Sequence, residues 1–214
     1  MSNIIKEWAP FSIEIALLAG DVLKKGFGSQ LTIDSKPGKQ NLMTKCDRAI
    51  DPLDGTLNFV HEIPPFSMST ALAVDKEVVC GVVYQPMTKE LFVTQKQQGA
   101  LLNSRSLNDP SVSQIDQAFL ATGFPYDVHK NPMHCIEHFS EVLRTGVPIR
   151  RLSSAAIDLA YVASGRFDGF WETGFNSWNL TAGMLLVKEA SGVVTHYDRT
   201  EHQLFGYHDL ISNK

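Results

Sequence analysis

The sequence has few cysteines and no long apolar run. Its three cysteines, Cys46, Cys80 and Cys135, are odd in number and form no close pair, which fits a reducing cytosol better than a disulfide framework. No stretch approaches the roughly 20 apolar residues of a membrane span. The N-terminal stretch Met1–Phe11 lacks the apolar run of a signal peptide. We therefore expect a cytoplasmic protein that does not act at a membrane.

The sequence also has fewer basic than acidic residues. The chain has 19 Lys and Arg residues against 23 Asp and Glu residues, which gives a net charge of −4. This balance argues against nucleic acid as the main partner, and it means that a phosphate site would draw its positive charge from bound metal. With 214 residues, 43% of them hydrophobic, the chain suits one globular domain over residues 1–214, with possible halves at 1–116 and 117–214.

The most informative stretch is Asp51-Pro52-Leu53-Asp54-Gly55-Thr56-Leu57-Asn58-Phe59. Pro52 fixes the backbone between two carboxylates, so this segment is held rigid. Asp51, Asp54 and the carbonyl of Leu53 supply the hard oxygen ligands that Mg²⁺ requires. A polar surface turn is the alternative, but the apolar residues that follow favour a site.

The residues directly after Asp54 suit a phosphate group. Gly55 lets the chain bend tightly and lets a ligand approach the backbone. The backbone amides of Gly55 and Thr56 are then available to a phosphate oxygen. We therefore expect metal and phosphate to meet at this turn.

The stretch Asp51–Phe59 resembles the signature of the inositol monophosphatase family, which are Mg²⁺-dependent, lithium-sensitive phosphatases of sugar phosphates. A second resemblance lies at Trp178–Gly183 and continues through Leu186–Ala190. Together they cover nearly the whole chain. The resemblance implies an α/β fold, the αβαβα sandwich, with Mg²⁺ as cofactor and a homodimer as the assembly.

The resemblance also implies roles for particular residues. Asn41–Asp47 is similar to a family segment whose aspartate pairs with the threonine after Asp-Gly, so Asp47 and Thr56 would orient the attacking water. Without the family, Asp47 would be an ordinary helix N-cap. The family contacts the sugar with the segment around Ser154 and Ala155, and Glu172 resembles the residue that accepts hydrogen bonds from inositol hydroxyls. A strand-end charge in water is the alternative for Glu172.

The sequence departs from the family pattern in three places. Asn179 stands where the family has an aspartate ligand of a second metal, and the chain ends at Lys214, before a terminal helix. A helix and a Gly-Glu-Glu segment that the family has between the equivalents of Asp47 and Asp51 are absent. Two Mg²⁺ ions about 4 Å apart repel each other by roughly 16 kcal/mol at an effective dielectric constant of 20. We therefore expect one tight metal, with a second arriving only together with substrate.

The short connection from Asp47 to Asp51 carries its own prediction. A helix that begins near Asp47 would be cut off at once, since Ile50 is typical of a strand end. This predicts that residues are missing between Asp47 and Asp51, with one Cα–Cα step far above about 3.8 Å and an intact mass several kilodaltons above 23.7 kDa. A continuous chain would instead favour a non-catalytic relative.

Periodicity predicts the remaining elements. Residues 66–74 alternate between large and small side chains, so we expect a strand whose small-residue face packs on helices. His134–His138 matches a zinc peptidase pattern, but we interpret it as a solvated helix face opposite a buried face of Met133, Ile136, Phe139 and Leu143. The remaining expected helices cover 10–25, a segment capped by Ser153 or Ser154 and ended by Gly165, and 178–190. The remaining expected strands cover 31–34, 78–84, 91–94, 118–122, 168–172 and 193–197, and residues 36–39 form a basic loop.

Taken together, these features predict Mg²⁺-dependent hydrolysis of a small polyol phosphate, most simply inositol monophosphate. The nearest alternatives are phosphatases of fructose bisphosphate or of phosphoadenosine. A more distant alternative is a catalytically weak or inactive relative that acts as a binding or regulatory protein.

Overall fold

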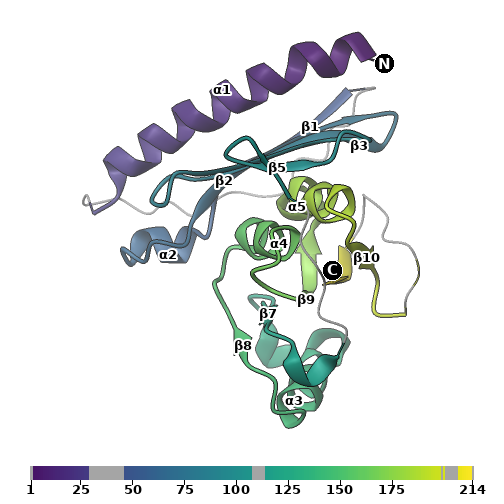
Figure 1. The fold of residues 1–214 in the computed structure, drawn as a ribbon. Helices are drawn as coiled ribbons and strands as arrows, with labels where there is room; N and C mark the ends of the chain where they lie inside the picture. The colour runs from purple at the N-terminus through teal and green to yellow at the C-terminus, as the bar shows by residue number, and fades with distance from the viewer. Residues whose placement is uncertain (1, 29–45, 108–113, 199, 201–206, 214) are drawn as a thin grey trace.

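A computed structural model of the chain describes residues 2–28, 46–107, 114–198, 200 and 207–213, and gives the backbone alone for residues 2–7, 46–50, 175–179 and 207–213. The chain forms stacked layers of helices and sheets (Figure 1). The predicted strand at 31–34 and the loop at 36–39 lie outside the described residues.

The first sheet is an antiparallel meander. Its strands follow chain order, β1-β2-β3-β4-β5-β6, and every neighbouring pair is antiparallel. The strands are β1 (Cys46–Asp54), β2 (Ser67–Val74), β3 (Glu77–Gln85), β4 (Glu90–Gln95), β5 (Ala100–Leu102) and β6 (Arg105–Ser106), and the short helix α2 (Thr56–Val60) follows β1. The predicted strands at 66–74, 78–84 and 91–94 are confirmed.

The second sheet is mixed, with strand order β10-β11-β9-β7-β8. Strand β7 is parallel to β8 and β9, whereas β11 is antiparallel to β9 and β10. Its strands are β7 (Leu120–Thr122), β8 (Ile149–Arg150), β9 (Gly169–Asn176), β10 (Val193–Thr195) and β11 (Tyr207–Asn213). Between β7 and β8 lie two 3₁₀ turns (Val128–Lys130 and Pro132–His134) and helix α3 (Cys135–Arg144); a third 3₁₀ turn (Ile115–Gln117) precedes β7.

Helices α4 (Ala155–Ala163) and α5 (Ser177–Glu189) lie between the two sheets, and α1 (Ser2–Gly26) covers the other face of the first sheet (Figure 1). The large residues of β2 face α1, where Met68 packs with Ala16. The small residues face α4 and α5, where Ala71 joins the main core. The expected small-residue face is therefore confirmed, and with α3 beyond the second sheet the layers form the expected αβαβα sandwich.

Close packing of α5 against its neighbours depends on two glycines. A Cβ on Gly81 of β3 would lie 3.0 Å from the Cα of Ala182, and a Cβ on Gly183 would lie 2.6 Å from the Cβ of Leu159 on α4. Since real side chains do not approach this closely, glycine at both positions lets α5 sit directly on β3 and α4. This contact joins the first sheet to the helical layer.

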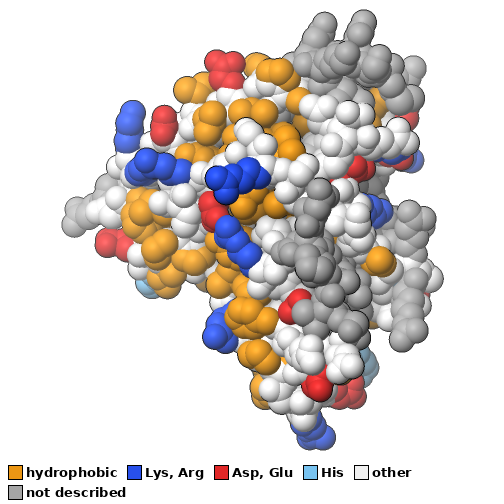
Figure 2. Space-filling view, in the orientation of Figure 1, with side chains coloured by type: hydrophobic (Ala, Val, Ile, Leu, Met, Phe, Trp, Pro, Cys, Tyr) orange, Lys and Arg blue, Asp and Glu red, His pale blue; other side chains and the backbone are white. Residues whose placement is uncertain are grey.

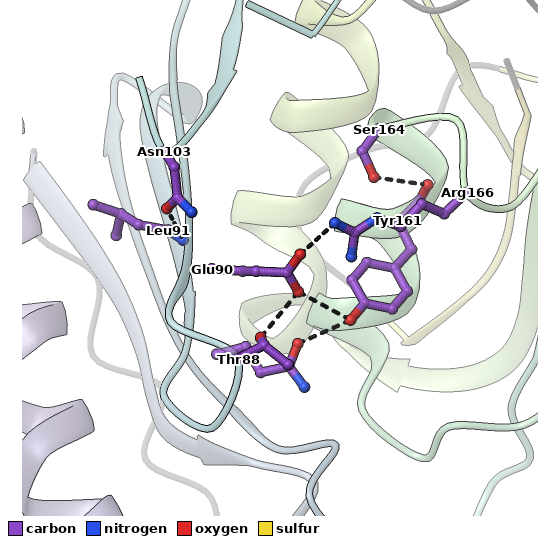
Figure 3. A network of polar contacts seen from close by, with 8 residues as sticks. Thr88, Glu90, Leu91, Asn103, Tyr161, Ser164 and Arg166 are labelled. Carbon is purple, nitrogen blue, oxygen red and sulfur yellow. Dashed lines mark hydrogen bonds and ion pairs between the residues drawn. The ribbon is translucent and has the colours of Figure 1, made fainter. Parts of the chain in front are cut away.

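A polar network ties the C-terminal end of α4 to the first sheet (Figure 3). The hydroxyl of Tyr161 lies 2.9 Å from Gln85 Oε1 and 3.1 Å from Glu90 Oε2, and Arg166 forms an ion pair with Glu90. Burial raises the pKa of Glu90, but the hydrogen bonds from Arg166 and Thr88 outweigh it and leave this pKa below its usual value. Helix α4 is thus held in a fixed place over the sheet.

The expectation of a helix at Asp47 is wrong, whereas the expectation of missing residues stays a prediction, which the intact mass tests. Strand β1 is continuous from Cys46 to Asp54, and its register with β2 runs without a break from Cys46↔Val74 to Asp51↔Ser69. The reason is tertiary: pairing with β2 satisfies the backbone hydrogen bonds of this segment, and this outweighs the local helix-cap signal.

Several other elements differ from expectation. Helix α1 begins at Ser2 and includes Pro10, so it is longer than predicted. Strands β5, β6, β8 and β11 were not predicted. In α3 the expected faces are wrong: Cys135 is buried and the ring of His138 lies 4.9 Å from that of Tyr197, while three expected core residues are exposed, namely Met133, Ile136 and Leu143.

The surface shows a mixed distribution of charge. On the face in Figure 2, described Lys and Arg side chains are interspersed with hydrophobic and acidic ones and form no continuous basic field. Among the described helices, none combines the length and the hydrophobicity that a membrane crossing requires.

Candidate active site

A β-bulge at the end of β1 sets the direction of the two candidate metal ligands. Asp51 pairs with Ser69 and Asp54 pairs with Ser67, so β1 has one residue more than β2 in this interval. The interval contains Pro52, which cannot donate to a ladder. Because of the extra residue, two side chains three positions apart emerge on the same face of the sheet. Both are buried, each with 8% of its surface exposed.

The face that carries these carboxylates meets the N-terminus of α4. The hydroxyl of Ser154 donates to Asp54 Oδ2 at 2.6 Å, and the amide of Ala156 donates to the same oxygen at 2.9 Å. Ser154 is the N-cap residue of α4, yet its side chain does not cap its own helix. The carboxylate of Asp54 therefore caps α4 from another element, at the end where the helix dipole favours negative charge.

Asp54 lies in an environment short of positive charge. Burial raises its pKa to about 7, and the charge of Asp51 adds to the rise, although hydrogen bonds from Ser154 and from the amides of Ala156 and Gly55 oppose it. A divalent cation beside both carboxylates would supply the missing positive charge.

Two further carboxyl groups, Asp158 and Glu172, interact electrostatically with Asp54. Burial, followed by the charges of Glu172 and Asp54, raises the pKa of Asp158 on α4 well above its usual value. Burial and the charge of Asp54 likewise raise the pKa of Glu172 on β9, whereas Arg151 lowers it. Asp158 Oδ1 is buried and has no hydrogen-bond partner among the described residues. The site thus gathers carboxyl groups from the first sheet, α4 and the second sheet.

The donor set at the end of β1 fits a hard divalent cation. Asp51 and Asp54 offer carboxylate oxygens, and the carbonyl of Leu53 accepts the Thr56 hydroxyl at 3.1 Å, which leaves it a second lone pair. Within the part of the chain that the structure describes, no group of three His, Cys, Asp or Glu side chains is placed to hold a metal. Other ligands would have to come from water and substrate.

The turn after Asp54 requires glycine. Gly55 has a φ of 85°, and a Cβ there would lie 2.9 Å from the carbonyl oxygen of Pro65. Its amide interacts with the Asp54 carboxylate and opposes the rise of that pKa, so it is less free for phosphate than expected. Thr56 begins α2, where its hydroxyl bonds to Leu53.

Two candidate residues fall where side chains are not described. Asn179 lies in the first turn of α5, and its predicted place at the metal stays a prediction. Asp47 lies seven residues before Asp54 on extended β1, a Cα separation of roughly 23 Å, and Thr56 follows Asp54 by only two residues. That distance does not favour the expected pairing of Asp47 with Thr56.

Several residues of the site were missed by sequence reasoning. Asn58 donates to the carbonyls of Pro65 and Leu152 at 2.5 and 2.6 Å, which fastens the turn to the chain before α4. Ser67 lies 3.4 Å from the Ser154 hydroxyl. Asp158 carried a usable signal, because it is the one charged residue in the otherwise apolar stretch Ala155–Ala163.

These features define a layered α/β protein with a cluster of buried carboxyl groups between its two sheets. Residues 49–213 match the model of the inositol monophosphatase family, and the chain therefore belongs to this family. The recognition made from the Asp51–Phe59 signature is confirmed. The family is in general metal-dependent.

Individual relatives agree with this assignment. An inositol-1-monophosphatase of Mesorhizobium japonicum is 41% identical over 164 residues, which cover 77% of this chain and 59% of the relative. The Nus factor SuhB of Escherichia coli is 38% identical over 178 residues, which cover 83% of this chain and 67% of the relative. The chain thus spans about three fifths to two thirds of the length of these curated relatives.

A solved structure supports the fold. The inositol monophosphatase from Anabaena (Nostoc) superimposes with a TM-score of 0.88 at 32% identity, covering 100% of this chain and 91% of that one.

Proposed function

We propose that this protein hydrolyses the phosphate monoester of a small polyol, most simply inositol monophosphate, with Mg²⁺ bound by Asp51, Asp54 and the carbonyl of Leu53. The observation that carries the proposal is the unit formed by Asp51, Asp54 and the N-terminus of α4, in which two buried carboxylates converge beside a helix start. The matched family and its inositol-1-monophosphatase members support the choice of substrate class.

The bound cation would lower the pKa of a water molecule and polarise the phosphate. The chain supplies the rest of the site. The amides of Gly55 and Thr56 bind a phosphate oxygen, and the Thr56 hydroxyl orients the attacking water. Ser154 and Ala155 at the start of α4 and Glu172 on β9 hold the polyol hydroxyls. The oxygen of water adds to phosphorus, the ester P–O bond breaks, and the proton that the water loses ends on the released alkoxide oxygen.

The proposal also covers lithium sensitivity, the assembly and the range of substrates. Lithium sensitivity and a homodimeric assembly are what the family resemblance implies. A fructose bisphosphate or a phosphoadenosine compound is an alternative substrate, because the residues at the phosphate do not fix the leaving group.

A second candidate is a catalytically weak or inactive relative that acts by binding. The continuous β1 favours it, because Asp47 then lies far from Thr56 and the sequence has no Gly-Glu-Glu segment between Asp47 and Asp51. The similarity to proteins named Nus factor SuhB is consistent with a role through a protein or nucleic-acid partner.

Phosphate release from inositol monophosphate discriminates between the two. We expect release by the full chain to depend on millimolar Mg²⁺ and to fall by about 100-fold or more in Asp54→Asn. Asp75→Asn, which changes an exposed carboxylate in the turn between β2 and β3, is the matched control and should keep full activity. No release by the unaltered protein at any Mg²⁺ concentration would leave the binding role as the better candidate.

A further inference from the structure

Gly123 lies directly beside the residue that precedes Glu172. It follows β7, and its amide donates to the carbonyl oxygen of Trp171 on β9 at 3.3 Å. The hydroxyl of Thr122 donates to the same oxygen at 2.9 Å. These two bonds fix the backbone of residue 123 against β9 at the point where the Glu172 side chain begins.

The space that a side chain at position 123 would fill is occupied by the carboxyl group of Glu172. A Cβ on Gly123 would lie 1.8 Å from Oε2, 2.1 Å from Cδ and 2.6 Å from Oε1 of Glu172. These are the three nearest atoms, so the whole carboxyl group lies over the glycine.

The backbone itself does not require glycine at this position. Gly123 is absent from the residues with positive φ, which include Gly55 and Gly174. An alanine could therefore adopt the same backbone conformation. An alanine would, however, displace Glu172, since its carboxyl group would have to move by more than an ångström to reach van der Waals distance from the new Cβ. Only the end of a flexible side chain has to shift, so the fold should tolerate the change.

The position of this carboxyl group matters because it is part of the site. Glu172 is partly exposed, and it interacts electrostatically with Asp54 and Asp158 on one side and with Arg151 on the other. A displacement of more than an ångström would break any hydrogen bond that it makes to a bound hydroxyl.

Building on the function proposed above, we propose that Gly123 is a positioning residue that sets selectivity for hydroxyl-bearing substrates. Its missing side chain gives the Glu172 carboxyl group a fixed place against the backbone, aimed at the polyol. Substrates without hydroxyl groups gain nothing from this arrangement.

Gly123→Ala tests the inference by comparing two substrates. For inositol monophosphate we expect kcat/KM to fall by about tenfold, chiefly through KM, because a hydrogen bond between Glu172 and a substrate hydroxyl is lost. For phenyl phosphate, which has no hydroxyl groups, the change should stay within about twofold. Gly26→Ala is the matched control: its Cβ would meet only Phe59 Cζ at 3.6 Å, and both substrates should react as in the unaltered protein.

A double variant shows whether the effect passes through Glu172. We expect Gly123→Ala to add nothing in a Glu172→Ala background, since the displaced group is gone. Additive losses, an unchanged ratio between the substrates, or a Gly123→Ala protein that does not fold would each overturn the inference. An unaltered protein without any phosphatase activity would overturn the proposed function, and this inference with it. If the protein is active but Gly123→Ala leaves its preference for inositol monophosphate over phenyl phosphate unchanged, the inference alone is overturned.

Discussion

At the scale of single residues, the most consequential group is the carboxyl of Asp54. Its pKa in the folded, metal-free chain is about 7, chiefly because it is buried. A carboxyl group in an unfolded chain has a pKa near its ordinary value, so the folded state binds this proton more tightly. The same buried negative charge, once formed, is what would attract a divalent cation.

This pKa predicts how stability depends on pH. Without metal, the contribution of Asp54 to the free energy of unfolding is fully present below about pH 4 and is lost as the pH rises through about 7, a decline of roughly 4 kcal/mol. Urea denaturation with EDTA at several pH values, comparing the natural protein with Asp54→Asn, measures this contribution as a difference. A stability difference that does not change between pH 4 and 8 would contradict the assignment. Added Mg²⁺ should stabilise the natural protein more at pH 8 than at pH 5.

Asn179 offers a second test at this scale. If its side chain lies at the metal site, Asn179→Asp adds a negative charge there and should tighten Mg²⁺ binding on the order of tenfold. It should also raise phosphatase activity. Calorimetric titration with Mg²⁺ gives the affinity, and weaker binding in the variant would show that residue 179 lies elsewhere.

At the scale of elements, the N-terminus of α4 is held to β1 by the Ser154 and Ala156 bonds to Asp54. At its other end the same helix is held to β4 by the pair of Arg166 and Glu90. Both ends of α4 are therefore fixed to the first sheet. This makes the helix part of the candidate metal site rather than a neighbour of it.

Ser154→Ala tests the contact at the N-terminus. Since the Ser154 hydroxyl lowers the pKa of Asp54, its removal raises that pKa further and lets protons compete better with metal. We expect Mg²⁺ affinity at pH 7 to fall by about tenfold and the loss to be smaller at pH 9. Ser164→Ala at the other end of α4, whose hydroxyl bonds to Tyr161, is the control and should bind Mg²⁺ normally. Equal losses at both pH values would mean that Ser154 acts by some other route.

Prediction from the sequence succeeded where the signal was local. The alternation in residues 66–74 was sufficient to predict β2, and the small side chains of one face were sufficient to predict that this face packs on helices. It failed at Asp47, because pairing with β2, more than twenty residues away, decided the structure there. Glu172 and Asp54 could be named in advance through the family, but the proximity of Asp158 and Gly123 to them depends on how the two sheets pack.

At the scale of the whole molecule, the candidate site belongs to neither sheet alone. Asp51 and Asp54 come from the first sheet, Ser154 and Asp158 from the helical layer, and Glu172 from the second sheet. Metal and phosphate would be held on one side and the polyol on the other. The division into a metal half at 1–116 and a substrate half at 117–214 stays a prediction, although the strands of each sheet fall within one of these ranges.

The bulge in β1 makes the site sensitive to the exact number of residues in this strand. Loops on the surface of a protein can gain or lose residues with little effect. Between Asp51 and Asp54, however, deletion of the single extra residue would turn Asp51 from the side of α4 to the side of α1. Two residues lie between Asp51 and Asp54, whereas one residue lies between their partners Ser69 and Ser67, and only this mismatch aims both carboxylates at one point. We therefore expect a deletion between Asp51 and Asp54 to disrupt the site, whereas the surface loops should tolerate changes in length.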